Sequence, residues 1–282
     1  MNTHQHMEPN QLAAKDLHAM LLGMIAPRPI AFVSTINRDG KPNLSPFSFF
    51  NIFSSNPPIL VFSPSRRIRD NSEKDTLRNV RTVPEVVVNL VDKNLLERMT
   101  LTSFDFPSAT NEFKAAGLTE AQSTHVRPPY VGEAKVALES KVNDIISLGT
   151  EGGAGNLVIC EVLCMHIHTD LLDQKNRFIQ DAFHPMARMG GSTYLDSTAR
   201  FEMDKLPRTV LGVHGLPKHI QESPVLTGEQ LAQLGKLKRY PLAEAFDILG
   251  VETPATPLAQ HQLAAKLIDQ KQIQAAMALL CK

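Results

Sequence analysis

The sequence predicts a mainly β protein with helices, in which an antiparallel barrel is followed by a helical C-terminal extension. Two observations predict this fold. Between residues 30 and 169, short runs rich in valine, isoleucine and phenylalanine alternate with turn-forming residues, a pattern typical of strands joined by hairpins. After Leu206, apolar residues recur instead at helical spacing. We therefore expect a barrel domain over residues 1–206 and a helical C-terminal extension over residues 207–282.

Composition limits the class of protein. The chain of 282 residues is 43% hydrophobic and 21% charged, with a formal net charge of zero, as in an ordinary globular protein. No basic excess favours nucleic acid or an anionic membrane, and no apolar run is long enough to span a bilayer. Three scattered cysteines, and an N-terminus without the pattern of a signal peptide, predict a reduced, cytoplasmic environment.

The first predicted elements are a helix and a hairpin. Residues 11–24 have the apolar spacing of an amphipathic helix, which Pro27 and Pro29 end. Residues 30–35 and the stretch 43–51 are expected to pair as antiparallel strands, with Asp39 and Gly40 supplying the positive-φ positions of the turn.

Further elements follow in chain order. Strands are expected at residues 59–63, 85–91, 134–148 and 157–169, and helices at residues 75–83, 93–101 and 111–117. Ser72 and Asp75 resemble an N-terminal cap of the first of these helices. In the extension, Thr227 and Gln230 predict a capping box, and residues 258–280 predict one helix rich in alanine and glutamine.

The stretch 43–51 carries hydroxyl and amide side chains between aromatic rings. If it is one strand, Ser45, Phe47, Phe49 and Asn51 share one face, and Pro46, Ser48 and Phe50 share the other. Pro46 has no N–H to donate, so the strand is expected at an edge or a bulge. The stretch suits either a flat, polar-edged ring that carries a phosphate or the packing of an ordinary aromatic core strand.

Several separated motifs agree with the first of these interpretations. They are residues 28–35, 37–40, 43–51, 57–63 and 74–79, and, much further along, residues 184–194. In this order and spacing they resemble the flavin reductase-like family, over roughly residues 20–205. The resemblance implies an FMN-binding split β-barrel that takes electrons from NADH or NADPH.

A phosphate site is expected where the helix at residues 75–83 begins. Arg66 or Arg67, with Lys74, offers positive charge, and the start of a helix offers free N–H groups. The resemblance implies that Thr76 donates a hydroxyl and that Asp75 shapes the turn. The alternative is a surface helix with a charged first turn.

The ring site is expected on the stretch 43–51. The resemblance implies that Ser45 and Ser48, with the backbone around Pro46 and Phe47, face the isoalloxazine and its ribityl chain. Asn51 and Ser63 are expected to reach the same pocket.

The segment 184–194 is the second family signature. The resemblance implies that Arg188 helps to hold flavin or nicotinamide phosphate and that Tyr194 stacks or hydrogen-bonds. Gly190 and Gly191 permit a close approach of the backbone. His184 is the candidate for handling a proton near neutral pH, although a lone loop histidine is more often structural.

No metal site is predicted. Cys164, His166 and His168 share one face of a strand, but alternate residues lie about 7 Å apart, too far for neighbours to chelate readily.

The resulting hypothesis is an NAD(P)H-dependent flavin reductase that passes a hydride to FMN, and from it to free flavin, a partner monooxygenase or another acceptor. The alternatives are a flavin-storage module without turnover and a flavoenzyme that acts directly on a small organic substrate. A homodimer is expected from the resemblance. The extension, whose apolar stripes need a partner surface, is expected to brace the fold or the dimer without joining the chemistry.

Overall fold

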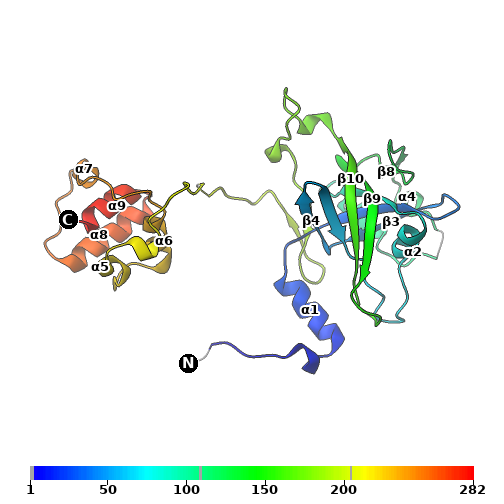
Figure 1. Ribbon diagram of the computed structural model, residues 1–282, viewed down its shortest axis with the longest axis horizontal. Helices are drawn as coiled ribbons and strands as arrows, with labels where there is room; N and C mark the ends of the chain where they lie inside the picture. The colour runs from blue at the N-terminus through cyan, green and yellow to red at the C-terminus, as the bar shows by residue number, and fades with distance from the viewer. Residues whose placement is uncertain (1–2, 108–109, 204) are drawn as a thin grey trace. The chain divides into compact units, whose positions relative to one another are not determined.

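The computed structural model describes residues 3–107, 110–203 and 205–282. The chain divides into two compact units, Met1–Arg200 and Phe201–Lys282, which we call the barrel unit and the helical unit (Figure 1). The division falls slightly before the boundary that the sequence suggests, after Leu206. None of the helices in the described ranges is long and apolar enough to cross a membrane.

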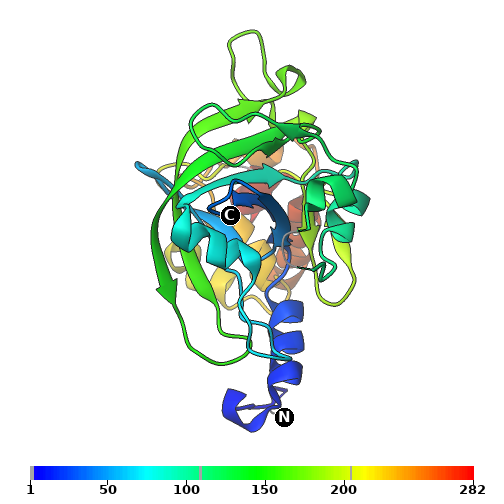
Figure 2. The same cartoon turned by 90° about the vertical axis from the view of Figure 1, so that its right-hand side faces the viewer.

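The barrel unit is built on one antiparallel, seven-stranded sheet in the order β3-β2-β6-β9-β10-β5-β4. Its strands are β2 (Ala31–Ile36), β3 (Pro42–Phe47), β4 (Phe50–Ser55), β5 (Pro58–Phe62), β6 (Glu85–Leu90), β9 (Val136–Ser147) and β10 (Asn156–Ile167). β3 and β4 form opposite edges, yet only Ser48 and Phe49 separate them in the chain. The sheet must therefore curl until its edges meet, and Figure 2 shows this split barrel.

The prediction of one continuous strand over residues 43–51 is wrong, because the chain turns a corner there. β3 ends at Phe47, and the carbonyl of Phe49 accepts a hydrogen bond from the Ser63 N–H at 2.8 Å. Pro46 does lie on an edge strand, as its missing N–H predicts. The hairpin of β2 and β3 is confirmed, but in its turn Gly40 alone has a positive φ, of 78°.

The inside of the barrel is apolar, and α2 (Asp75–Thr82) closes it with Leu77 and Val80. Phe62, Val86 and Val158 are among the fully buried residues of this core. The predicted cap of α2 is wrong: the Ser72 hydroxyl donates to Asp70 instead, and no side chain caps the N-terminus of the helix. Its first N–H groups remain available to a ligand.

A second layer packs outside β3. It contains α3 (Leu96–Leu101), α4 (Glu112–Ala115), the small sheet β1-β11-β12 (Arg28–Pro29, Met186–Arg188, Tyr194–Asp196) and the pair β7 (Glu120–Ala121) and β8 (Tyr130–Val131). The helix α1 (Ala14–Met24) precedes this layer in the chain and has no buried residue. The core of the layer includes Phe32, Leu44, Met99, Phe113 and Met186. This packing brings the segment 184–194 to the corner between β3 and β4.

The helical unit has its own core. Its helices are α5 (Lys218–Gln221), α6 (Gly228–Gly235), α7 (Glu244–Asp247), α8 (Pro257–Asp269) and α9 (Ile273–Leu280), and they bury Ile220, Leu234, Phe246 and Ile268 together. The capping box of Thr227 and Gln230 is confirmed. The single helix predicted at residues 258–280 is wrong, since the chain turns at Lys271, whose φ is 64°.

One buried histidine of the helical unit has a defined tautomer. The Ser223 hydroxyl accepts hydrogen bonds from the N–H groups of Val225 and Leu226, at 3.2 and 3.1 Å. The same oxygen lies 2.6 Å from Nδ1 of His261. Because the oxygen already accepts two bonds, its own proton is directed to Nδ1. His261 is therefore neutral, with its proton on Nε2.

Candidate functional site

Two adjoining cavities lie where β3, α2, α3 and the small sheet meet. The first is lined by Ile30, Pro46, Phe47, Ser48, Met99, Ser103, Arg188 and Tyr194. The second is lined by Asn43, Ser45, Arg67, Lys74, Asp75, Thr76, Thr102, Ser103, Phe104, Asp105, Phe106 and Glu112. Ser103 belongs to both, so the cavities form one elongated site.

The first cavity combines apolar walls with a cationic rim. Phe47 and Met99 contribute apolar surface, and the Arg188 guanidinium lies 4.4 Å from the centre of the Tyr194 ring. Nη2 of Arg188 donates to the carbonyl of Gly191 at 2.6 Å, which fixes the guanidinium beside the ring. This surface suits a planar ligand whose edge accepts hydrogen bonds.

The second cavity has the features of an anion site. Lys74 lies at its wall, directly before α2, and in the part of the chain that the structure describes it forms no ion pair. Burial lowers the pKa of the Lys74 amine, as does the charge of Arg67. Such a desolvated cation, next to the uncapped start of a helix, favours a negatively charged ligand.

Thr76 lies on the floor of the second cavity. It is 1% exposed, and its hydroxyl accepts a hydrogen bond from Nδ2 of Asn43 at 3.0 Å. The hydroxyl proton is therefore free to point elsewhere. Asn43 from β3 and Thr76 from α2 hold each other in place beneath the site.

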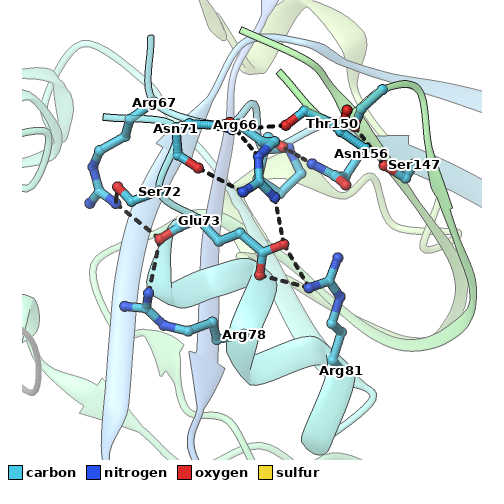
Figure 3. Close-up of polar contacts among 12 residues, drawn as sticks. Arg66, Arg67, Asn71, Ser72, Glu73, Arg78, Arg81, Ser147, Thr150 and Asn156 are labelled. Atoms are coloured by element: carbon cyan, nitrogen blue, oxygen red, sulfur yellow. Dashed lines mark hydrogen bonds and ion pairs between the residues drawn. The ribbon is translucent and has the colours of Figure 1, made fainter. Parts of the chain in front are cut away.

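Arg67 lines the second cavity and Arg66 does not. Figure 3 shows the Arg66 guanidinium directed toward Asn71 and Glu73. The Arg66 guanidinium binds Asn71 at 2.6 Å and Glu73 at 2.9 Å, away from both cavities. Arg67 lines the second cavity and is held by the carbonyl of Glu73 at 3.0 Å and by Asp105 at 3.2 Å. Arg66 thus shapes the loop that presents Arg67.

The carboxylates of the second cavity are largely compensated. Asp75 pairs with Arg78, and Asp105 pairs with Arg67 and, at 2.7 Å, with Arg69. Burial raises the pKa of Glu112, even though its carboxylate accepts the N–H of Leu44 at 3.0 Å. A bound anion therefore meets less negative charge than the composition of the wall suggests.

Most of the residues predicted from the sequence come together here. Ser45, Pro46, Phe47, Ser48, Lys74, Asp75, Thr76, Arg188 and Tyr194 line one cavity or the other. Ser45 and Ser48 lie in different cavities, because the corner after β3 turns the chain between them.

Four predicted residues lie outside both cavities. Asn51 is exposed on β4, where its side chain accepts the N–H of Ile52. The Ser63 hydroxyl accepts the N–H of Asn156 at 3.0 Å, and Arg66 binds its own loop. Nδ1 of His184 is buried and has no hydrogen-bond partner among the described residues.

Sequence reasoning missed the loop after α3. Thr102, Ser103 and Asp105 complete the second cavity, but they lie in a polar segment without periodicity. Asn43 could have been predicted, because it begins the stretch 43–51 and carries an amide side chain.

A separate polar cluster surrounds Glu139, which is 0% exposed. One carboxylate oxygen accepts the N–H of Thr124 and contacts Nε2 of His166, and the other accepts the N–H groups of His125 and Val126. Atoms of His125, Glu139 and Cys164 lie within 4.8 Å of one another. The four hydrogen bonds already use the acceptor capacity of the carboxylate. We therefore interpret the cluster as the anchor of the loop 124–126.

Comparison with known protein families shows the class of protein to which this fold belongs. A family model for the flavin reductase like domain matches residues 24–187, and the chain belongs to this family.

The chain is also similar to individual proteins and solved structures. A protein of Aquifex aeolicus is 38% identical over 64% of this chain and 89% of its own length. The crystal structure of nitrilotriacetate monooxygenase component B from Bacillus cereus matches with a TM-score of 0.67 and 31% identity, over 72% of this chain and 100% of that one. The 2-nitrobenzoate 2-nitroreductase NbaA of Pseudomonas fluorescens matches with a TM-score of 0.64 and 31% identity, over 71% of this chain and 96% of that one.

Proposed function

We propose that the chain is an FMN-binding oxidoreductase, an NAD(P)H-dependent flavin reductase. The observation that carries the proposal is the pair of adjoining cavities, one suited to a planar ring and the other to an anion. The charge of each cavity and their adjoining positions match a flat ring joined to one phosphate. FMN, when bound, would accept a hydride from NADH or NADPH and pass the electrons to an acceptor.

Each wall of the site has a role in this proposal. Lys74, Arg67 and the N-terminus of α2 would hold the phosphate, with Thr76 donating a hydroxyl. Pro46, Phe47 and Ser48 would hold the ring against Tyr194 and Arg188. Since hydride transfer is the chemistry of the cofactor, the protein needs chiefly to position the two rings.

The direct test is to titrate the purified protein with FMN and then mix the complex anaerobically with NADH or NADPH. Rapid loss of the yellow flavin absorbance supports a reductase. Tight FMN binding without bleaching by either nucleotide would instead support a storage module. Absence of FMN binding would overturn both.

We expect Thr76→Ala to weaken FMN binding by about 1–2 kcal/mol, because a hydrogen bond to the charged phosphate is lost. Lys74→Met is expected to cost about 1.5–3 kcal/mol, since it removes a charged donor from a desolvated site. Fluorescence titration measures both dissociation constants. Thr82→Ala is the matched control, because the Thr82 hydroxyl on the same helix bonds the carbonyl of Asn79. Wild-type affinity in both site variants would place the phosphate elsewhere.

A second candidate is direct reduction of a small aromatic substrate. It is favoured by the 31% identity to NbaA, whose name states action on 2-nitrobenzoate. Adding 2-nitrobenzoate to the reduced complex without oxygen separates the candidates: reoxidation of the flavin supports the second, and reoxidation only by free flavin supports the first. The likeness to nitrilotriacetate monooxygenase component B makes a partner monooxygenase a further acceptor to test.

We also propose that the chain forms a homodimer through the barrel unit. The edge strand β4 exposes Ile52 and Phe53, at 67% and 69%, and β10 exposes Met165 at 62%. Apolar side chains on an unpaired edge favour coverage by another chain.

Light scattering is expected to give twice the mass of one chain at micromolar concentration. Phe53→Asp should shift the protein to monomer by placing a charge in the interface. Ile248→Asp serves as control, because Ile248 is also exposed, at 83%, but lies in the helical unit. A monomeric wild type would refute the dimer.

A further inference from the structure

Behind the first cavity lies a buried cation that the proposed function does not use. Arg28 on β1 is 6% exposed. Nη1 donates to the carbonyls of Leu22 and Ile25 at 2.5 and 2.6 Å, and Nη2 donates to the carbonyl of Met189 at 2.8 Å. Nε lies 3.4 Å from the hydroxyl of Ser48, which lines the cavity.

All of these acceptors are neutral. Within the described ranges, Arg28 forms no ion pair with a carboxylate. A buried charge is ordinarily paired, and here only hydrogen bonds and the C-terminal end of α1 offset it. Burial lowers the pKa of the Arg28 guanidinium, as does the charge of Arg188, but an arginine still keeps its proton.

A second cation lies beside the first. Arg28 and Arg188 are direct partners in the register of β1 and β11, and Arg188 lines the cavity. The described lining of the first cavity contains no aspartate, glutamate or histidine. The cavity therefore has one positive charge in its wall, Arg188, and a second directly behind it, Arg28, and its described lining contains no carboxylate or imidazole.

We propose that Arg28 is a positioning residue that, with Arg188, forms a fixed positive wall favouring the reduced, anionic form of the ring over the oxidised, neutral form. The inference rests on the proposed function. Addition of a hydride, which is two electrons and one proton, to a neutral ring leaves one negative charge, and the nicotinamide donor leaves with one positive charge. Without an acid in the wall to add a second proton, that negative charge must be stabilised electrostatically.

The consequence is measurable as a reduction potential. For a two-electron couple, a tenfold preference for binding the reduced form raises the potential by about 30 mV. Arg28→Met should lower the ratio of reduced to oxidised FMN affinity about tenfold, and so lower the potential of the bound flavin by about 30 mV. Arg28→Lys keeps the charge and should retain most of the ratio.

The experiment is an anaerobic dye-equilibration titration of the FMN-loaded protein and its variants. The affinity for sulfite, which adds to the oxidised ring and leaves it anionic, is a second readout and should fall in parallel. The same comparison of a methionine and a lysine variant is made at the half-buried Arg188, with Arg188→Met and Arg188→Lys. It tests the inference if Arg28→Met does not fold.

The outcomes are distinct. Normal FMN binding with unchanged potentials in both methionine variants overturns this inference alone. Equal losses in the lysine and methionine variants also overturn it, because shape rather than charge would then matter. Failure of the wild-type protein to bind FMN overturns the proposed function, and this inference with it.

Discussion

Replacing Glu139 by alanine should cost the barrel unit about 3–5 kcal/mol of unfolding free energy, the usual result of removing one partner from a buried charged cluster. The carboxylate is fully buried and accepts the N–H groups of Thr124, His125 and Val126 at 2.7, 2.5 and 3.1 Å. It also contacts Nε2 of His166, which stacks on Tyr130 with ring centroids 4.5 Å apart. Alanine leaves these donors without an acceptor. Urea unfolding followed by circular dichroism measures the loss.

Glu139→Gln is the matched control. Glutamine keeps the shape and one acceptor oxygen but removes the charge, so we expect a smaller cost, of about 1–3 kcal/mol. If alanine costs no more than glutamine, the loop 124–126 satisfies its N–H groups with water, and the carboxylate is not its anchor.

The contribution of Glu139 should depend on pH. Burial raises the pKa of this carboxyl, but the hydrogen bonds from His166 and the three N–H groups outweigh burial and hold the pKa below the ordinary value of 4.5. A carboxyl with a lowered folded-state pKa stabilises the fold fully above 4.5 and loses that contribution as the pH falls further. The difference in stability between the wild type and Glu139→Gln should therefore shrink in acid.

The second large effect is expected in the helical unit. Phe246→Ala should destabilise that unit by about 3–5 kcal/mol, because it opens a cavity in a small core. Phe246 is 1% exposed, and every buried member of its core lies between Leu216 and Leu280. The loss should leave the affinity for FMN unchanged. Denaturant unfolding followed by both circular dichroism and flavin fluorescence separates the two units.

Phe32→Ala provides the reciprocal control. Phe32 is 0% exposed in the second-layer core of the barrel unit, so its loss should weaken flavin binding and leave the helical unit intact. A chain cut after Arg200 should likewise keep a flavin spectrum. If Phe246→Ala abolishes FMN binding, the helical unit contributes to the site and our division of labour is wrong.

The sequence predicted the strands well where a turn signal separated them. Gly40 marks the hairpin of β2 and β3, and Pro46 marks an edge strand. The strand prediction failed at Ser48 and Phe49. The alternation of aromatic residues continues there through a corner that only the closure of the barrel imposes. The helix prediction failed at Lys271, a residue other than glycine whose backbone adopts the left-handed conformation between α8 and α9.

The residues that line the candidate site were predictable where a sequence motif marks them, and not in the loop after α3. Lys74 and Thr76 carry a helix-start signal, and Arg188 and Tyr194 belong to a family motif. Ser103 joins the two cavities from a loop that has no periodicity, and it reaches them only through the packing of α3. The sequence could not decide between Arg66 and Arg67. The decision depends on side-chain contacts, because Arg66 binds Asn71 within its own loop and Arg67 is held by the carbonyl of Glu73.

The burial of His261 beside His219 implies that acid acts on the two units in sequence. Burial and the nearby His219 lower the pKa of His261 below its ordinary value of 6.5. A histidine with a lowered folded-state pKa binds its proton more readily in the unfolded chain, so its contribution to stability is lost as the pH falls below 6.5. The contribution of Glu139 persists until the pH falls below 4.5. Between these two values, mild acid would loosen the helical unit through His261 while the barrel keeps its buried carboxylate.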